Sequence, residues 1–449
     1  MARLFGTDGV RGLANVDLTA PLALELGEAA ARLTIQGRPA SGHKPKAIIG
    51  RDTRISGEFL DHALAAGLAS AGMDVVRVGV VTTPTVAHLT ASSSVDLGVM
   101  ISASHNPMPD NGIKFFAHGG YKLPDQVEDQ IQELLNTSWD RPTGAAVGEV
   151  EYDDDWAEKS YIEHLMTSLG TDLHGLRIAV DCANGGASFL APEAFRQAGA
   201  DAVVINAAPD GRNINDKAGS THPEQLQALT VASEADFGVA YDGDADRCLA
   251  VDRDGNIVDG DKIMGALAVH MRDEGQLAKD TLVVTVMSNL GLILAMQEAG
   301  IKTVQTGVGD RYVLEAMLEG GYSLGGEQSG HIIAKKYATT GDGILSSLLL
   351  ARMVKESGRD LADLTSFIKR LPQTLINVGG VDRSRANTDP VVAEAVAAAE
   401  AVLGNTGRVL LRPSGTEPLV RVMVEAATQA QADGVASRLA DVVKENLSL

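Results

Sequence analysis

The sequence has little cysteine, no long apolar segment and no repetitive stretch. Because only two cysteines occur, Cys182 and Cys248, a disulfide framework or a cysteine zinc site is disfavoured. No run of about 18 uncharged apolar residues is present, and the first residues lack the apolar core of a signal peptide. We therefore expect a cytoplasmic globular protein that does not associate with membranes.

Basic residues are also few relative to acidic ones. The chain has 59 Asp and Glu against 38 Lys and Arg, a formal net charge of −21. This balance disfavours binding to nucleic acid, which needs a basic surface. It still allows a small anionic substrate, because a local cluster of arginines can outweigh the overall field.

Units of a short apolar strand, a polar loop and an amphipathic helix recur along the chain. They begin near residues 47, 176 and 281 of the 449-residue sequence. Such alternation predicts α/β domains with mixed or parallel sheets. The length alone indicates about three domains and does not separate two from four.

A short internal sequence similarity, called the sequence echo below, suggests that one domain is duplicated. Residues 93–99, SSVDLGV, resemble residues 233–239, SEADFGV, and each segment leads through a strand into an unusual polar loop. Between the copies, the acidic residues 148–157 lose periodicity and mark a boundary. From about Pro372, short strands and two helices predict a smaller α+β domain.

The first polar loop that carries chemistry is YDGDADRC, residues 241–248. Its three aspartates, Asp242, Asp244 and Asp246, alternate and would share one face of an extended segment. Packed carboxylates repel one another unless a cation lies between them, and oxygen ligands suit Mg²⁺ or Ca²⁺ rather than zinc. An EF-hand is rejected, because Arg247 and Arg253 stand where that motif needs Gly and Glu. A solvated acidic turn is the remaining alternative.

The stretch SASHNPMPDNGIKFF, residues 102–116, places a serine-rich loop after an apolar strand. Since Mg²⁺ keeps coordination positions for phosphate oxygens, Ser104 becomes a candidate nucleophile or phosphate carrier. A phosphoserine would add about −1.5 to −2 charge and three acceptor oxygens. His105, Asn106 and Lys114 would orient the loop or move protons. A Pro-rich turn with capping serines is the alternative.

Two further loops suggest sugar and phosphate binding. In GGEQSGH, residues 325–331, Glu327, Ser329 and His331 alternate, and a carboxylate with a hydroxyl can hold neighbouring sugar hydroxyls. In RPSGTEP, residues 412–418, arginine, hydroxyls and backbone N–H groups form a plausible phosphate cradle, with Arg421 close behind. Ordinary glycine-containing turns are the alternative in both cases.

The four loops, in this order and across essentially the whole chain, resemble the α-D-phosphohexomutase superfamily. Residues 5–12, FGTDGVRG, and Gln328 in the sugar loop resemble the branch that acts on glucosamine phosphates, whereas relatives acting on mannose and glucose phosphates usually carry Met in place of Gln328. The resemblance implies an isomerase that interconverts glucosamine 6-phosphate and glucosamine 1-phosphate through a 1,6-bisphosphate. That reaction leads toward UDP-N-acetylglucosamine and peptidoglycan precursors.

The resemblance also implies the fold. We expect three topologically similar α/β domains with mixed sheets and a smaller C-terminal α+β domain, arranged around a central cleft. The predicted domains carry the serine, metal, sugar and phosphate loops in turn: residues 1–155, 156–256, 257–370 and 371–449.

Roles for individual residues follow from the resemblance alone. Ser104 is expected to be phosphorylated and, with the three aspartates, to ligate Mg²⁺. A hexosamine or glucose 1,6-bisphosphate is expected as activator, and a homodimer is left open. The other expected site residues are Glu327 and Ser329 for sugar hydroxyls, Arg412, Ser414, Gly415, Thr416 and Arg421 for the distal phosphate, Lys114 and His331 for proton transfer, and Arg11 and Arg247 for charge balance.

Three rival functions are retained. The first is a phosphomannomutase or phosphoglucomutase of the same superfamily. The second is a metal-dependent phosphatase that uses the same serine and metal and releases free phosphate. The third is an acidic Ca²⁺-binding or scaffold protein without isomerase activity.

Overall fold

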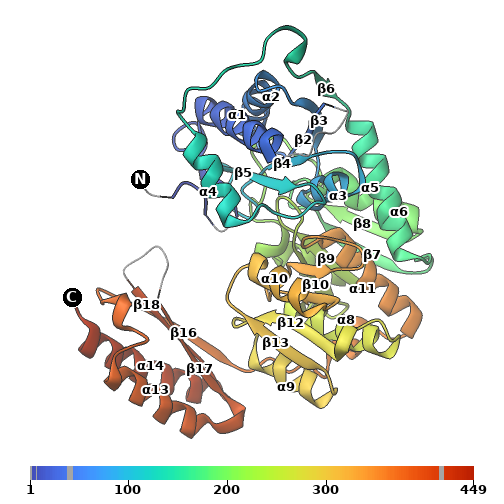
Figure 1. The fold of residues 1–449 in the computed structure, drawn as a ribbon. Helices are drawn as coiled ribbons and strands as arrows, with labels where there is room; N and C mark the ends of the chain where they lie inside the picture. Colours follow the sequence, from blue (N-terminus) through green and yellow to red (C-terminus); the bar gives the residue numbers. More distant parts are fainter. Residues whose placement is uncertain (1–2, 7, 38–43, 414–418) are drawn as a thin grey trace. The chain divides into compact units, whose positions relative to one another are not determined.

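The computed structural model describes residues 3–6, 8–37, 44–413 and 419–449 (Figure 1). The chain divides into two compact units. Unit 1 comprises Met1–Met287 and Ile301–Ser366, and unit 2 comprises Ser288–Gly300 and Phe367–Leu449. Within the described parts of the chain, no helix is both long and apolar enough to span a bilayer.

The first domain of unit 1 is built on a mixed sheet with the strand order β1-β5-β4-β2-β3-β6. Its central strand β4 is buried along its whole length, which explains the continuous apolar sequence LGVMI. The strands are β1 (Val10–Leu13), β2 (Lys46–Arg51), β3 (Asp74–Val80), β4 (Leu97–Ile101), β5 (Asp110–Ala117) and β6 (Val150–Tyr152), and the helices are α1 (Ala20–Gly37), α2 (Ser56–Ser70), α3 (Thr83–Ser92) and α4 (Asp125–Leu134).

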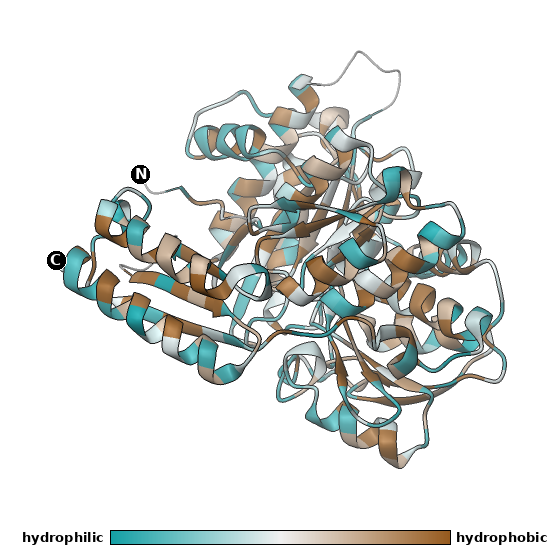
Figure 2. Ribbon diagram, turned by 90° about the horizontal axis from the view of Figure 1, so that it is seen from below, coloured by the Kyte–Doolittle hydropathy of each residue, from teal (hydrophilic) through white to brown (hydrophobic). Residues whose placement is uncertain are grey.

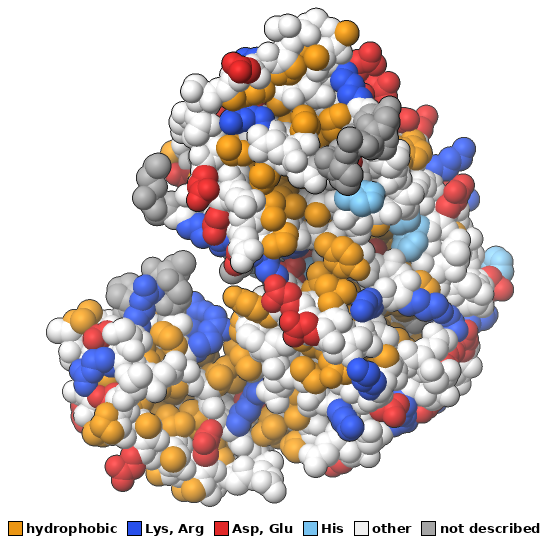
Figure 3. All heavy atoms as spheres, viewed as in Figure 1, with side chains coloured by type: hydrophobic (Ala, Val, Ile, Leu, Met, Phe, Trp, Pro, Cys, Tyr) orange, Lys and Arg blue, Asp and Glu red, His pale blue; other side chains and the backbone are white. Residues whose placement is uncertain are grey.

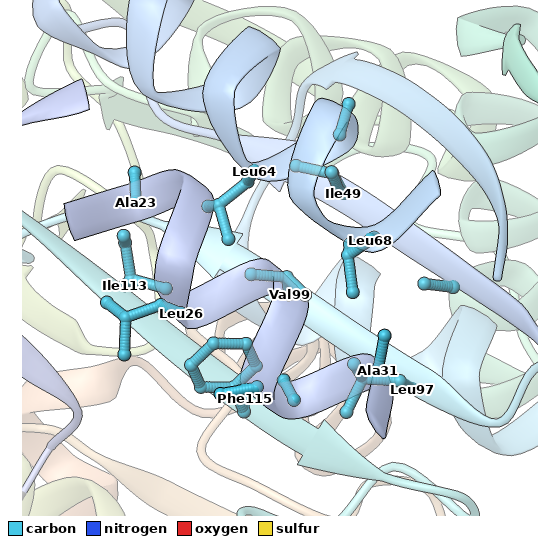
Figure 4. Packing of buried hydrophobic residues seen from close by; sticks show 14 of the residues in the cluster. Ala23, Leu26, Ala31, Ile49, Leu64, Leu68, Leu97, Val99, Ile113 and Phe115 are labelled. Carbon is cyan, nitrogen blue, oxygen red and sulfur yellow. The ribbon is translucent and has the colours of Figure 1, made fainter. Parts of the chain in front are cut away.

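The core of this domain lies between the sheet and helices α1 and α2, which pack side by side. Leu26 of α1 and Leu64 of α2 point toward Val99 of β4 and Phe115 of β5 (Figure 4). All four side chains are buried. Burying an aliphatic or aromatic side chain of this size contributes about 1.5–3 kcal/mol, so this layer fixes the strand from which the serine loop begins.

The second domain has a sheet with the order β11-β10-β9-β7-β8, and the third has the order β13-β12-β14-β15. The second contains β7 (Arg177–Asp181), β8 (Asp201–Ile205), β9 (Phe237–Tyr241), β10 (Cys248–Asp252), β11 (Ile257–Val258), α5 (Asp154–Leu169), α6 (Ala187–Ala198) and α7 (Glu224–Ala232). The third contains β12 (Thr281–Thr285), β13 (Lys302–Thr306), β14 (Leu324–Gly326), β15 (Ile332–Ala334), α8 (Gly260–Asp273), α10 (Asp310–Gly320), α11 (Gly343–Ser357) and α12 (Leu361–Thr365).

The three sheets share one topology. Each contains a run of four strands in the spatial order fourth, third, first, second: β5-β4-β2-β3, β10-β9-β7-β8 and β15-β14-β12-β13. In each run the third strand is parallel to the first, and the fourth returns antiparallel to the third. The prediction of topologically similar α/β domains with mixed sheets is therefore confirmed.

This common topology explains the sequence echo and relates the loops to one another. The echoed segments, residues 93–99 and 233–239, both enter the third strand of their domain, β4 and β9. The serine loop, the metal loop and the sugar loop each connect the third strand to the fourth. The three loops are thus the same hairpin connection, elaborated differently in each domain.

The C-terminal part of unit 2 is a smaller α+β fold, as predicted, and its sheet is antiparallel. Its sheet has the order β16-β18-β17 and packs against α13 and α14, whose residues alternate between hydrophobic and hydrophilic in Figure 2. The elements are β16 (Gln373–Gly379), α13 (Pro390–Leu403), β17 (Arg408–Pro413), β18 (Leu419–Glu425) and α14 (Gln429–Leu447). Unit 2 also holds α9 (Leu290–Glu298).

Charged side chains are mixed on the molecular face shown in Figure 3. Acidic and basic groups are interspersed there among uncharged ones. With a net charge of −21, this mixture does not resemble the clustered basic surface on which nucleic-acid binding depends.

Candidate active site

The serine loop and the metal loop meet in unit 1. Ser104 is buried, and its Oγ donates a hydrogen bond of 2.5 Å to Asp242 Oδ2. The backbone at Ser104 is left-handed, with φ +53°, a conformation that costs a non-glycine residue about 1–2 kcal/mol. The loop therefore holds Ser104 in a strained position that aims its hydroxyl at the acidic cluster.

The three aspartates form a compact, buried candidate metal site. Their carboxylates offer oxygens that all lie within 4.8 Å of one another. Burial and the charges of Asp246 and Asp244 raise the pKa of Asp242 to about 8. Asp244 Oδ1 and Asp246 Oδ1 are buried without a hydrogen-bond partner among the described residues. A divalent cation would satisfy both oxygens and remove the repulsion, so the donor set fits a hard metal ion.

The path of the chain through this site differs from the prediction. The aspartates were expected to alternate along an extended segment, but the segment is a tight turn. Ala245 N donates to Asp242 O at 3.1 Å, and Ala245 has φ +55°. The turn brings the carboxylates together more closely than an extended strand would, because it folds the chain around them.

Lys114 and Thr83 connect this turn to the first domain. Lys114 Nζ lies 2.8 Å from Asp244 Oδ2 and 3.0 Å from Asp8 Oδ2. Thr83 Oγ1 donates to the same Asp244 oxygen at 2.6 Å. Burial alone lowers the pKa of Lys114, but Asp244 and Asp8 raise it above its ordinary value. Lys114 is therefore a charged ammonium beside the metal loop.

His331 reaches the site from the third domain. It is buried, and its Nδ1 lies 3.5 Å from Asp246 Oδ2. Its Nε2 accepts a hydrogen bond of 3.0 Å from Gly341 N, which leaves Nδ1 as the nitrogen that carries the proton. The imidazole therefore presents an N–H to Asp246.

Arg247 and Arg11 lie around His105, the residue that follows Ser104. Arg247 Nη1 is 3.2 Å from His105 Nδ1. Burial lowers the pKa of His105, and the charges of Arg247 and Arg11 lower it further. Arg11 is also ion-paired with Asp8. Both arginines thus add positive charge close to the serine loop, where a phosphate group would add negative charge.

The sugar loop is a turn rather than an extended segment, so its alternating residues do not share one face. Gly330 N donates to Glu327 O at 2.9 Å. Ser329 is exposed, whereas His331 is buried. Glu327 Oε1 accepts from Gly309 N at 3.1 Å, and Gln328 Nε2 donates to Asp261 Oδ2 at 3.1 Å. These contacts do not test sugar binding, so the role of Glu327 and Ser329 as sugar ligands stays a prediction.

In unit 2, Arg412 of β17 and Arg421 of β18 lie directly opposite each other in the antiparallel ladder. In an antiparallel pair, residues in facing positions share one face of the sheet, so this register brings the two arginine side chains to the same face. The predicted ligands Ser414, Gly415 and Thr416 lie outside the described residues.

Comparison with known proteins identifies the family. Residues 2–141, 159–255, 259–371 and 375–442 match, in order, the models of phosphoglucomutase/phosphomannomutase alpha/beta/alpha domains I, II and III and of its C-terminal domain. The chain belongs to the phosphoglucomutase/phosphomannomutase family.

Relatives within the phosphoglucomutase/phosphomannomutase family cover the whole chain. A phosphoglucosamine mutase of Bifidobacterium animalis subsp. lactis is 60% identical over 454 residues, with both chains fully covered. A crystal structure of a family member from Burkholderia thailandensis is 26% identical, with a TM-score of 0.81 and coverage of 100% of this chain and 99% of that chain. The Aspergillus fumigatus N-acetylphosphoglucosamine mutase, solved with GlcNAc-6P and magnesium, is 20% identical, with a TM-score of 0.70 and coverage of 98% and 95%.

Three half-buried residues of this chain lie near the candidate active site but were not predicted to belong to it: Asp8, Lys122 and Asp310. Lys122 Nζ forms ion pairs with both carboxylates. Asp310 Oδ2 in turn lies 3.6 Å from His331 Nε2. Asp8 could have been suspected from its place in the motif FGTDGVRG. Lys122 and Asp310 stand alone in the sequence and are brought together only by the fold.

Replacing Gly243 with alanine is expected to separate the serine and metal loops. A Cβ at this position would lie 2.5 Å from Ser104 O and 2.9 Å from Asn215 Nδ2. Because the first neighbour is backbone, the loops must move apart, and a misplacement of about 1 Å at reacting groups costs about 100-fold in turnover. Steady-state kinetics of Gly243→Ala would test this, with Gly434→Ala in α14 as control. Wild-type turnover in Gly243→Ala would show that the close approach is unnecessary.

Proposed function

We propose that the protein is a phosphoglucosamine mutase that interconverts glucosamine 6-phosphate and glucosamine 1-phosphate through a phosphorylated Ser104. The observation that carries the proposal is the 2.5 Å contact between Ser104 Oγ and Asp242 Oδ2 inside a buried carboxylate cluster. Family membership supports the reaction type. The 60% identity to a phosphoglucosamine mutase over the full length supports the amino-sugar substrate and a role in UDP-N-acetylglucosamine and peptidoglycan precursor synthesis.

The proposed transfer takes place between Ser104 and the sugar. The bond from phosphorus to Ser104 Oγ breaks as a bond forms from phosphorus to the free hydroxyl oxygen of the bound sugar phosphate. The sugar hydroxyl gives up its proton to a proton handler at the site as this bond forms. In the second transfer the bond from phosphorus to the other sugar oxygen breaks, that oxygen takes up a proton, and the phosphoryl group passes to Ser104 Oγ. Catalysis of such a transfer depends on positioning and on charge stabilisation rather than on new covalent chemistry.

Charged side chains around Ser104 supply that stabilisation in the proposal. Lys114, fixed by Asp244 and Asp8, would balance charge on the transferring group. Lys114 and His331 are the proposed proton handlers, and both are buried beside the metal loop. Lys114, a charged ammonium, would donate a proton and would accept one only after donating its own. Arg11 and Arg247 would offset the charge of the phosphoserine from the side of His105.

We propose that Asp242, Asp244, Asp246 and the phosphate on Ser104 hold Mg²⁺. The two buried carboxylate oxygens without hydrogen-bond partners support a hard cation at this position. When bound, the ion would stabilise negative charge on the transferring phosphoryl oxygens.

The phosphate that does not react needs a separate site, because the bisphosphate must turn around between the two transfers. We assign this role to Arg412 and Arg421, which face each other across β17 and β18, together with Ser414, Gly415 and Thr416. Arginine suits the task since its planar fork can take two phosphate oxygens in either orientation of the sugar.

The remaining predictions belong to the same proposal. A hexosamine or glucose 1,6-bisphosphate would reload Ser104 whenever an intermediate escapes, which makes it an activator. The reaction would run in the cytoplasm. A homodimer stays open, and neither a nucleic acid nor a membrane is required.

The substrate assignment is tested by comparing turnover of glucosamine, glucose and mannose 6-phosphates in one assay. We expect kcat/KM for the glucosamine compound to exceed the others by about 100-fold. This is less than the roughly 10⁴–10⁵-fold by which a hydrogen-bonding site rejects an analogue that lacks the polar group, because here a hydroxyl replaces the amine. A larger kcat/KM for mannose or glucose 6-phosphate would make the protein a phosphomannomutase or phosphoglucomutase instead. Release of inorganic phosphate in place of an isomer would identify the phosphatase alternative.

A further inference from the structure

The backbone of Ser104 is held by side chains from two domains. Ser104 O accepts hydrogen bonds from Arg54 Nη2 at 3.0 Å and from Asn215 Nδ2 at 2.9 Å. Ser104 N donates to Ser102 Oγ at 2.9 Å, and Ser102 Oγ donates to Asp52 Oδ2 at 2.6 Å. Both polar atoms of the Ser104 peptide backbone are therefore fixed, on the one residue of the serine loop that has a left-handed φ.

Arg54 donates hydrogen bonds to backbone carbonyls along the whole serine loop. It is completely buried, and among the residues that the structure describes its only carboxylate partner is Asp52, at 2.9 Å. Its other donors go to backbone carbonyls of the loop: to Ser104 and Asn106 from Nη2, and to Pro107 and Asp110 from Nη1. A fully buried arginine that donates its hydrogen bonds to one loop fixes the path of that loop. If the loop moved, each broken hydrogen bond would leave a buried polar group without a partner.

Asn215 adds a contact from the second domain. The residue is buried, and its Nδ2 donates to Ser104 O and, at 3.2 Å, to Asn106 O. Its own backbone is anchored through a hydrogen bond from Asn215 N to Ala183 O at 2.9 Å. The serine loop is thus clamped between Arg54 on its own domain and Asn215 on the domain that carries the aspartates.

We propose that Arg54 and Asn215 are positioning residues for the phosphoryl transfer. They hold Ser104 in its left-handed conformation, so that Oγ stays aimed at the Asp242 carboxylate through both transfers. Neither residue touches the sugar or the metal in this role. The inference rests on the proposed function of Ser104, and it assigns a task to two residues that the motif patterns of the sequence did not indicate.

A residue that merely supports the fold and one that positions Ser104 differ in single-turnover kinetics. Phosphorylated enzyme is mixed with glucosamine 6-phosphate, and loss of phosphate from the protein is followed after rapid quenching. A loss of folded protein lowers the amplitude of this reaction and leaves its rate constant unchanged. A misplaced Oγ lowers the rate constant itself.

We expect Asn215→Ala and Arg54→Lys to lower the rate constant by about 10- to 100-fold, with KM for the sugar phosphate unchanged. Arg54→Lys keeps the buried charge beside Asp52 but cannot reach the four carbonyls. Asn213→Ala is the matched control, because Asn213 lies in the same loop and its side chain, among the described residues, bonds only to the backbone of that loop. Its Nδ2 donates to Ala208 O and its Oδ1 accepts from Asp210 N, both at 3.0 Å.

The outcomes separate this inference from the proposed function. A wild-type enzyme that never carries phosphate on Ser104 would overturn the proposed function. If the wild type transfers its phosphate, and Asn215→Ala and Arg54→Lys do so with the rate constant of Asn213→Ala, the positioning role alone is overturned.

Discussion

Replacing Ser104 with alanine is expected to lower mutase turnover by about 10,000-fold or more, the scale of losses on removal of a nucleophile. Alanine removes the oxygen that carries the phosphoryl group, and no other hydroxyl in the structure hydrogen-bonds to Asp242 among the described residues. The fold should persist, because the change removes only the side-chain hydrogen bonds of Ser104 to Asp242 and His105 and leaves those of the backbone. Turnover, the far-ultraviolet circular dichroism spectrum and the thermal midpoint measure these effects.

Ser92→Ala is the matched control for this experiment. Ser92 is exposed at the end of α3 in the same domain, so its replacement should leave turnover and stability at the wild-type level. An active Ser104→Ala enzyme with the control also active would falsify the proposed mechanism.

Replacing Asp244 with asparagine is expected to lower Mg²⁺ affinity and turnover together, with a loss in turnover of about 1,000-fold. The amide keeps the size of the side chain and an oxygen for Thr83, but it removes a charge from the cluster and from Lys114. Alanine is less suitable, because it would leave a buried lysine without its nearest carboxylate, which destabilises by about 3–5 kcal/mol.

The prediction for Asp244→Asn is tested by measuring how Mg²⁺ binding and turnover depend on the metal. Calorimetric titration with Mg²⁺ reports affinity, and turnover is followed after chelation and after readdition of the ion. Asp254→Asn, at the bend of the β10–β11 hairpin, is the control and should behave as wild type. Full activity of chelated wild-type enzyme, or of Asp244→Asn without added Mg²⁺, would contradict a role for the ion.

The sequence predicted the contact between the serine loop and the acidic loop because each is an interruption of a buried strand. Polar residues that follow an apolar strand are confined to one edge of a sheet, and three closely spaced aspartates imply a shared cation. The local geometry was not predictable in the same way. The turn at Asp242 to Asp246 depends on a left-handed Ala245, which alternation along the chain does not reveal.

Residues whose roles depend on tertiary contacts could not be predicted from motifs or spacing in the sequence. Arg54, Asn215, Lys122 and Asp310 belong to no repeated spacing, and each acquires its role from partners that lie far away along the chain. Arg54, for example, contacts Ser104 across 50 residues, and Asn215 contacts it across 111. The fold of the first domain brings Arg54 to Ser104, and the packing of the second domain against the first brings Asn215 there.

The composition of unit 2 was also unforeseen. Helix α9 follows β12 of the third domain in sequence, yet it belongs to the unit that contains the C-terminal domain. The buried carboxylate of Glu425 accepts hydrogen bonds from Asn289 Nδ2 and from Leu290 N at the start of this helix, at 3.1 and 2.9 Å. The predicted domain limits and the predicted central cleft stay predictions.

The phosphorylation state of Ser104 tests the central claim most directly. The purified protein is incubated with glucose 1,6-bisphosphate, freed of it, and digested for mass spectrometry before and after addition of glucosamine 6-phosphate. We predict one phosphate on the peptide that contains Ser104, which disappears when the sugar is added and is recovered as sugar bisphosphate. Phosphate on a different peptide, or its release as inorganic phosphate, would contradict the account.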